Sequence, residues 1–275
     1  MEKVMEVKGK EHGVSAERQW ASVSNTILNS CWELSMVERS IIMLALGNMR
    51  SSLPANSNTL YELDIKDYAT LRKISTQDAY ETLKENSNKL FERHISIKNH
   101  PGIKGTYKFR WINGINFIAE EHKIRIQWSQ HILEFISELR AGNFTQLPLS
   151  EYIPMEGKYT TRLWDMLVQE RWKGCIGVKR VDIDELIENW CIPESCRALK
   201  VLKSKILKPA IKELELKGLA LILLKDGRKD RKFVKELIFE YKLEKADKLD
   251  LKEEKVVQKQ QINQRLEEKF ERKSV

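Results

Sequence analysis

The chain has 275 residues, of which 41% are apolar and 32% are charged, and its formal net charge is +8. This length suits one large domain or two ordinary ones, and the apolar fraction is sufficient to build a core. The longest apolar runs are too short to span a bilayer, and the N-terminus lacks the apolar stretch of a signal peptide. We therefore expect a soluble, cytoplasmic protein with no membrane partner. The four cysteines form no C-x-x-C pair and suggest no disulfide framework.

The first half of the chain predicts a series of helices and strands after a polar, flexible segment at 1–20. A short helical piece is expected at 24–30, and a helix from the N-cap Ser35, with Glu38 completing a capping box, to about Arg50. A strand then precedes a helix near 64–71, and apolar spacing predicts an amphipathic helix over 75–93. HISIKNHPGIKGTYKFRWI reads as a hairpin, HKIRIQW as a strand, and SQHILEFISEL as a helix that begins at a serine cap.

The second half repeats this order. KYTTRLWDMLVQERWKG predicts a helix ended by Gly174, CIGVKRV a strand, and DIDELIENW a further helix. ALKVLKSKILKPAIKELELKG follows as a helix that Pro209 should kink, because proline has no N–H to donate to Lys205. The next segment, to about residue 242, predicts a hairpin whose turn contains Asp226-Gly227.

The spacing of helix starts supports an internal repeat. Asp64-Ile65 and Asp182-Ile183 each open a helix, and the next helix–helix junctions, at Ser75 and Pro193, lie 11 residues further on in both halves. The order helix, strand, helix, helix, hairpin is that of a winged helix. We therefore predict an α+β chain of two tandem winged-helix domains, at 21–141 and 142–243. The charged segment 244–275 is interpreted as a solvated helix, with a partner-binding helix as the alternative.

Positive charge is concentrated in two places. Residues 196–232 contain twelve Lys/Arg and four acidic residues, a local net charge of +8, and residues 93–110 contain five Lys/Arg and no acidic residue. Basic patches on an otherwise balanced chain are typical of proteins that bind polyanions.

The helix at about 196–217 has the strongest nucleic-acid signal. At 100° per residue, Leu199, Leu202, Ile206 and Ala210 share one face. The candidate DNA-contacting residues of the opposite face and its edge are Arg197, Lys200, Lys203, Ser204 and Lys208. Arg197 comes early in the helix, where base edges are usually read, whereas the later lysines are expected to meet phosphates.

Two hairpins are further candidates for DNA contact. The tip KDGRKDRK supplies Arg228, Lys229 and Arg231, and the hairpin of the first half supplies Lys98, Lys104 and Lys108. Each could lie along the DNA backbone, and each could instead be an ordinary solvated turn. In the helix at 75–91 the glutamates offset the lysines, so backbone or subunit contact is favoured there over base readout.

No catalytic or cofactor motif is apparent. The sequence contains no G-x-x-x-x-G-K-[ST] loop, and its five histidines form no H-x-H or H-E-x-x-H pattern. The acidic residues 182, 184 and 185 are better explained as helix cap and dipole residues than as a magnesium site. We therefore expect a protein that is not an enzyme and has neither a metal nor a cofactor.

Four segments resemble the iteron-binding plasmid replication initiator (Rep) family. They are SNTILNSCWELSMVERSIIMLAL, FTQLPLSEYIPMEGKYTTRLWDML, LKVLKSKILKPAIKELE and GRKDRKFVKELIFE, and together the similarity spans about 20–242. The third, with Pro209-Ala210-Ile211, is the most specific. By this resemblance Lys200, Lys203, Ser204 and Lys208 match DNA-contacting helix positions.

The resemblance implies what the protein does. It implies that a monomer binds tandem repeats of double-stranded DNA at a plasmid origin and opens the origin, with the host initiator protein and the replicative helicase as partners. It also implies autorepression by a homodimer formed through the first domain. The alternative is a dimeric winged-helix transcriptional repressor, and a relaxase or nickase is a third, less favoured, hypothesis.

Overall fold

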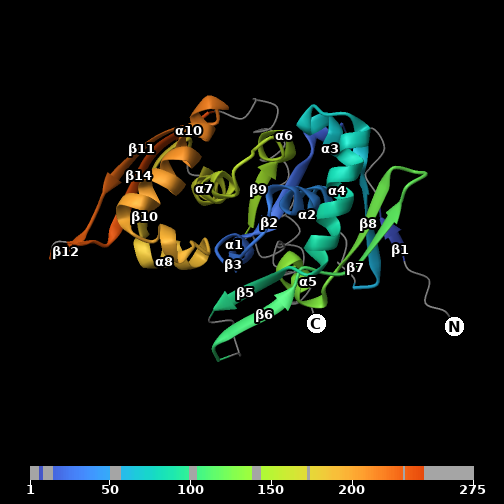
Figure 1. Ribbon diagram of the computed structural model, residues 1–275, viewed down its shortest axis with the longest axis horizontal. Coiled ribbons are helices and arrows are strands. Elements are labelled where there is room, and N and C mark those ends of the chain that lie inside the picture. Colours follow the sequence, from blue (N-terminus) through green and yellow to red (C-terminus); the bar gives the residue numbers. More distant parts are fainter. Residues whose placement is uncertain are drawn as a thin grey trace, which may run out of the picture.

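The computed structural model describes residues 6–8, 15–49, 57–98, 104–137, 144–171, 174–231 and 233–244. Most of the N-terminal segment predicted to be flexible, and the charged tail beyond Glu244, lie outside these residues. No helix within the described ranges has the length and apolar character needed to cross a membrane. Two winged-helix domains make up the structure, one on the right of Figure 1 and one on the left. The predicted α+β class is confirmed.

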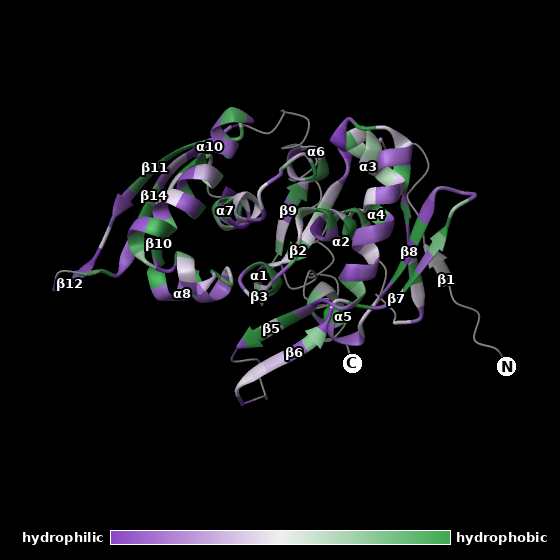
Figure 2. Ribbon diagram, viewed as in Figure 1, coloured by the Kyte–Doolittle hydropathy of each residue, from purple (hydrophilic) through white to green (hydrophobic). Residues whose placement is uncertain are grey.

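The first domain surrounds the central helix α2, most of whose residues are buried. Figure 2 shows α2 as mainly hydrophobic, whereas α4, which packs on it, is mixed. The main sheet of the first domain has the strand order β1-β4-β8-β7, a second sheet has the order β3-β5-β6, and β2 pairs with β9. The elements of this half are β1 (Glu6–Lys8), η1 (Ala16–Arg18), β2 (Trp20–Ser24), α1 (Asn25–Leu28), β3 (Cys31–Trp32), α2 (Met36–Gly47), β4 (Thr59–Asp64), α3 (Ile65–Arg72), α4 (Thr76–Phe91), β5 (His94–Lys98), β6 (Thr106–Arg110), β7 (Ile112–Ile118), β8 (Lys123–Trp128), α5 (Gln130–Ser137), β9 (Phe144–Pro148) and α6 (Leu149–Tyr152).

The second domain contains a three-stranded sheet, with the strand order β10-β14-β11, and the helices that cover it. Its helix α10 packs against α7, which also contacts α1 of the first half. The elements are α7 (Lys158–Val168), β10 (Ile176–Asp182), α8 (Ile183–Asn189), η4 (Glu194–Cys196), α9 (Leu199–Val201), η5 (Leu202–Leu207), α10 (Lys208–Leu216), β11 (Ala220–Asp226), β12 (Lys229–Asp230), β13 (Phe233–Val234) and β14 (Glu236–Leu243).

The helix starts are where the capping residues predicted them. Ser35 accepts a hydrogen bond from the Glu38 backbone N–H, and the Glu38 carboxylate accepts one from the Ser35 N–H, so the capping box is complete. Asp64 and Asp182 are the N-caps of α3 and α8, and the carboxylate of each accepts a hydrogen bond from the backbone N–H two residues further on. Ser75 caps α4. These local bonds satisfy donors that a helix leaves unpaired.

Two helices end earlier than predicted. α2 ends at Gly47, not near Arg50, and the side-chain amide of the C-cap residue Asn48 donates to the Glu62 carbonyl of β4, at 2.7 Å. α7 ends at Val168, well before Gly174. Gly174 lies in the loop that enters β10, where its φ of +139° is a conformation that glycine adopts without penalty.

Pro209 disturbs its helix by a change of hydrogen bonding. The chain is helical from Leu199 to Leu216, but Leu202–Leu207 form a π-helical turn directly before Pro209, which lies at the start of α10. A π turn replaces the i−4 bond by an i−5 bond and appears mostly as a single insertion. A disturbance of the helix next to Pro209 is therefore present, as predicted, and the structure shows it as a π turn.

The strand pairing corrects the predicted wing of the first domain. In the second domain the strand before the two helices, β10, pairs with β14, which pairs with β11. In the first domain the strand before the two helices, β4, pairs with β8, which pairs with β7. The wing of the first domain is therefore β7–β8. The predicted hairpin, β5–β6, does form, but it is an additional element that extends from β3.

The wing of the second domain is longer than predicted. Asp226-Gly227 is not its turn, because Asp226 still faces Leu237 in the ladder and the Gly227 N–H donates to the Glu236 carbonyl. The chain continues through the small β12–β13 ladder, and the turn lies at Arg231, whose φ is +53°. In Figure 1 this tip extends away from the rest of the molecule.

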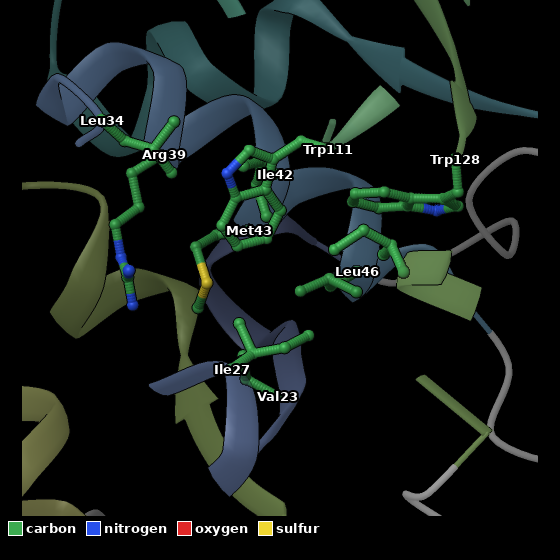
Figure 3. A pocket seen from close by; sticks show the side chains of 10 residues that line it. Val23, Ile27, Leu34, Arg39, Ile42, Met43, Leu46, Trp111 and Trp128 are labelled. Atoms are coloured by element: carbon green, nitrogen blue, oxygen red, sulfur yellow. The ribbon is translucent and has the colours of Figure 1, made fainter. Parts of the chain in front are cut away.

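The first-domain core contains an apolar pocket, shown in Figure 3. Trp111 and Trp128 form part of its wall, with Met43 and Leu46 of α2 between them and the β2–α1 segment. Arg39 lies at its edge and directs its guanidinium away from the apolar side chains. The lining is almost entirely apolar, and all ten of its residues are buried in the core of the first domain.

Two buried arginines and one buried aspartate hold α7 to the first domain. Arg39 of α2 donates to Asp165 of α7, with 2.5 Å between Nη2 and Oδ2, and it also donates to the Tyr152 hydroxyl. The guanidinium carbons of Arg39 and Arg162 lie 4.0 and 3.5 Å from the Trp32 ring centroid. Burial raises the pKa of Asp165 to about 6, although the two arginines oppose that rise. Its second carboxylate oxygen, Oδ1, is buried without a hydrogen-bond partner among the described residues.

The raised pKa of Asp165 predicts a stability that falls as pH rises. Between its ordinary pKa of 3.8 and about 6 the folded protein binds a proton that the unfolded chain releases. The free energy of unfolding should therefore fall across this window, by about 3 kcal/mol from this group. Urea unfolding at pH 4 to 7 should show that component in the unmodified protein and not in Asp165→Asn.

Glu62 provides a control of opposite sign. Burial acts to raise the pKa of Glu62, but Lys123 and Arg125 together outweigh it and hold that pKa below the ordinary value, so the contribution of Glu62 to stability is lost as pH falls. Glu62→Gln should remove stability near neutral pH and leave the Asp165 component unchanged. A pH profile that is identical in Asp165→Asn and the unmodified protein would show that Asp165 is ionised throughout the window.

The structure also departs from the expectation of isolated cysteines. Cys31 of β3 and Cys191, two residues after α8, are joined by a disulfide, whereas Cys175 and Cys196 are free. The pair is 160 residues apart in sequence, and no spacing motif indicates it.

Candidate nucleic-acid interface

The helical segment Leu199–Leu216 has two distinct sides. Leu202, Ile206 and Ala210 are buried, as predicted, and Leu207 joins them. On the other side Lys200, Ser204 and Lys208 are exposed. Lys205 is exposed as well, and the sequence analysis did not single it out. A helix that packs by one face and presents lysines on the other is suited to a polyanionic groove.

Arg197 lies just before this helix. The helix starts at Leu199, and Arg197 follows the 3₁₀ turn η4. Its Nε donates to the Ile192 carbonyl at 3.1 Å, while the residue as a whole is exposed. One guanidinium N–H therefore fixes the side chain to the turn between the two helices. The terminal nitrogens have no hydrogen bond or ion pair with the residues that the structure describes.

Lys203 links the helix to the wing. Its ammonium group forms an ion pair with the carboxylate of Asp226 at the end of β11, and its side chain is only 24% exposed. This contact brings the helix and the base of the wing together. It also means that Lys203 is less available to a ligand than Lys200 or Lys208.

The wing tip presents three cations. Arg228 is 71% exposed, and its guanidinium lies 3.6 Å from the Asp182 carboxylate. Lys229 and Arg231 are exposed, and neither side chain has a hydrogen bond or an ion pair within the described part of the chain. The tip thus continues the positive surface of the helix, and the hairpin projects it outward.

Phe233 on β13 is a candidate that the sequence analysis missed. This large apolar side chain is 73% exposed. It lies at the same tip as Lys229 and Arg231, and it faces Asp230 across the small ladder. In the sequence it is one residue of the predicted hairpin, and no pattern distinguishes it. Its exposure follows from the β12–β13 ladder, which places Phe233 beyond the end of the three-stranded sheet.

The β5–β6 hairpin lies beside the second domain. The Lys98 ammonium forms an ion pair with the Glu188 carboxylate of α8. Lys108 faces Ser96 in the ladder and so shares a face with Lys98, while Lys104 is exposed in the loop before β6. The structure therefore places Lys98 at a contact between the domains, and it leaves Lys104 and Lys108 exposed.

The second helix of the first domain, α4, is less basic on its exposed side. The Lys89 ammonium lies 2.7 Å from the Glu85 carboxylate, and Glu81 is exposed nearby. Among the described residues, no three His, Cys, Asp or Glu side chains gather as a possible metal site. The largest set of exposed cations on connected elements is thus on the second domain, at Leu199–Leu216 and the wing tip.

Comparisons with known proteins agree with this architecture. A family model described as "Initiator Replication protein, WH1" matches residues 20–168, and one described as "Initiator Rep protein, WH2" matches residues 182–241. A curated Escherichia coli protein described as "Replication initiation protein" is 26% identical over 210 residues, which are 74% of this chain. The chain spans only 65% of that relative's length.

Two solved structures share the fold or part of it. The Pi initiator protein in complex with iteron DNA has a TM-score of 0.69 and 18% identity, over 84% of this chain and 99% of that chain. The WH1 domain of MSBI1.176, a replication protein isolated from a multiple sclerosis patient, covers 39% of this chain and 83% of its own. That second comparison has 23% identity and a TM-score of 0.33.

Proposed function

The chain belongs to the initiator replication protein family, and on this premise we propose that it is a plasmid replication initiator that binds the tandem repeats of its origin. The observation that carries the proposal is the exposed basic side of Leu199–Leu216, with the cationic wing tip beside it. The description of the curated relative and the iteron DNA bound to the Pi initiator support it.

The second domain supplies the main DNA contact in this proposal. The segment Leu199–Leu216 enters the major groove, as the second helix of a helix-turn-helix does. Lys200 and Arg197 reach base edges, because both are exposed at its N-terminal end. Ser204 and Lys208 contact phosphates further along, and Lys203 orients the wing through Asp226. Arg228, Lys229 and Arg231 follow the DNA backbone.

The first domain has a supporting role. Lys104 and Lys108 contact the DNA backbone from the β5–β6 hairpin, whereas Lys98 is held by Glu188. We further propose that the monomer opens the origin with the host initiator protein and the replicative helicase, and that a dimer formed through the first domain represses its own gene. No enzymatic step is required of the protein in this scheme.

A gel shift at physiological salt tests repeat recognition. The probes are the repeat-containing DNA next to the gene and a random duplex of equal length, each with a salt series. A ladder of discrete complexes on the repeats, with far weaker binding to the random duplex, is expected. Equal and equally salt-sensitive binding to both probes would contradict the proposal, because the lysine surface would then act only as an electrostatic contact.

Two further assays separate the alternatives. An origin plasmid that replicates only when the protein is supplied indicates an initiator, since a pure repressor would not support replication. Incubation with supercoiled origin DNA should leave it intact. Nicked product would identify a relaxase or nickase.

Lys200→Ala should weaken binding to the repeats by about 1–3 kcal/mol and relax specificity at one base position. The physical reason is that Lys200 is exposed at the N-terminal end of the helix, where base edges are reached. Lys217→Ala is the matched control, because it removes the same charge just beyond the end of α10. Unchanged affinity of Lys200→Ala would contradict the assignment of this helix to the major groove.

A further inference from the structure

The two domains are joined by a covalent bond as well as by packing. The disulfide links Cys31 of β3, in the first domain, to Cys191, which follows α8 in the second. The two Cα atoms are 6.1 Å apart, within the usual range for a disulfide. Since α8 is the first helix of the second helix-turn-helix, the bond lies between the first domain and the DNA-contacting unit.

Non-covalent contacts hold both cysteine-bearing segments in place. Arg162 donates to the carbonyls of Ser30 and Asn189, at 2.8 and 2.6 Å, and these residues are close neighbours of Cys31 and Cys191. The ion pair between Lys98 and Glu188 adds a second link to the same end of α8. These contacts do not depend on the disulfide, so they would keep the two sulfurs near each other when the bond is reduced.

The backbone conformation at Cys191 also helps to bring the two cysteines together. Its φ is +50°, in the left-handed region that residues other than glycine seldom adopt. The turn is fixed by the Cys191 and Ile192 N–H groups, which donate to the Glu188 and Ile187 carbonyls. The bend places Cys191 against β3. Both bonded cysteines are partly exposed, so a small reagent can reach them.

We propose that Cys31 and Cys191 form a thiol–disulfide modification site that reacts with low-molecular-weight disulfides of the glutathione type. One protein thiolate attacks the small disulfide, forms a mixed disulfide and releases one small thiol. The second thiolate then attacks the protein sulfur of the mixed disulfide and releases the other small thiol. Overall, two protein thiols are oxidised to one disulfide, and one small disulfide is reduced to two small thiols. In compartments that keep thiols reduced, such disulfides are usually transient and redox-sensing.

Oxidation fixes the end of α8 to the first domain. This bond then restrains the orientation of the second helix-turn-helix relative to β5–β6. In the reduced protein the restraint comes from packing, from the Arg162 and Lys98 contacts, and from the Arg39–Asp165 pair. This consequence rests on the proposed function. If the protein binds DNA through both domains, its redox state determines whether the two domains can change their relative orientation when they bind the same DNA.

Peptide mapping of the full chain tests the chemistry. The protein is incubated with oxidised glutathione or with dithiothreitol, free thiols are alkylated, and the digest is analysed without reduction. We expect a peptide pair that joins Cys31 to Cys191, reversed by dithiothreitol, with Cys175 and Cys196 alkylated in both samples. Pairing that involves Cys175 or Cys196, or no cross-link at all, would overturn the proposal. This measurement needs no variant.

Thermal stability and hydrogen exchange test whether the disulfide restrains the two domains. The oxidised protein should melt about 5–10 °C higher than the reduced protein, because the bond closes a 160-residue loop. Amide exchange in α8 and β3 should slow on oxidation in the unmodified protein and in Cys175→Ser/Cys196→Ser, but not in Cys31→Ser. A cross-link that forms without slower exchange there would show that it does not restrain the domains.

A gel shift in both redox states tests the link to DNA. The affinities of the oxidised and reduced protein for the repeats should differ by at least about threefold, and those of Cys31→Ser should not differ. Equal affinities would limit the site to stability and overturn the link to DNA. If neither form prefers the repeats, the proposed function fails, whereas the peptide map still decides whether the thiol site exists.

Discussion

Replacing Arg162 by alanine is expected to destabilise the protein by about 3–5 kcal/mol. Arg162 is 3% exposed and donates to three backbone carbonyls, those of Leu28, Ser30 and Asn189. Its loss leaves two buried acceptors and one partly buried acceptor without their donor, and each buried acceptor typically costs about 1–3 kcal/mol. The variant also loses the contact between the guanidinium and the Trp32 ring.

One effect acts in the opposite direction. Burial and the charge of Arg39 lower the pKa of Arg162 well below its ordinary value, so the native protein holds this cation at a cost. Removing it relieves the repulsion from Arg39. Three unsatisfied carbonyls should outweigh that relief, because the alanine side chain supplies no donor and leaves a space beside Trp32.

Equilibrium unfolding in urea measures the Arg162 effect. Arg180→Ala is the matched control, because Arg180 is 62% exposed and its ion pair with Glu236 is on the surface. That variant should lie within about 1 kcal/mol of the unmodified protein. A loss below about 1 kcal/mol for Arg162→Ala would show that water replaces the guanidinium and that the junction is not the element that unites the two domains.

Replacing Lys229 and Arg231 together by alanine should reduce DNA affinity about ten- to a hundredfold at physiological salt and lower the salt slope by about two. The two side chains are exposed at the wing tip and have no partner within the described part of the chain. They are therefore available to phosphates. Each phosphate contact releases about one counterion, so losing two contacts changes both the affinity and its dependence on salt.

The double variant should bind every sequence more weakly to a similar degree. Its ratio of repeat to random affinity should stay the same, since phosphate contacts carry no sequence information. The control is Lys217→Ala with Lys242→Ala, which removes two exposed charges of the same domain, one at the C-terminal end of the helix and one at the end of β14 far from the wing tip. A changed repeat-to-random ratio would instead show that the wing reads bases or the shape of a groove.

Local sequence predicted much of the fold. The capping residues Ser35, Asp64, Ser75 and Asp182 identified helix starts, because each bonds to a backbone N–H only two or three residues away. Helical periodicity placed Leu202, Ile206 and Ala210 on the buried side. The strand β7 went unrecognised because a bulge between Ile112 and Gly114 interrupts its alternation of inward and outward residues.

Strand pairing decided which hairpin is the wing. Both β5–β6 and β7–β8 are hairpins, and the difference between them is that β8 pairs with β4 and β5 pairs with β3. These partners lie far away in sequence, so no local rule selects them. The same holds for the length of the second wing, which depends on the extra ladder between β12 and β13.

The sequence by itself determined the two-domain plan, the helix starts and the concentration of positive charge in residues 196–232. These features follow from composition, periodicity and bonds between near neighbours. Only the tertiary structure decided which cations are available, since Lys203 pairs with Asp226 and Lys98 with Glu188. It also decided the junction of Arg162, Cys31 and Cys191, because that junction joins segments separated by more than a hundred residues, and only the packed fold brings them into contact.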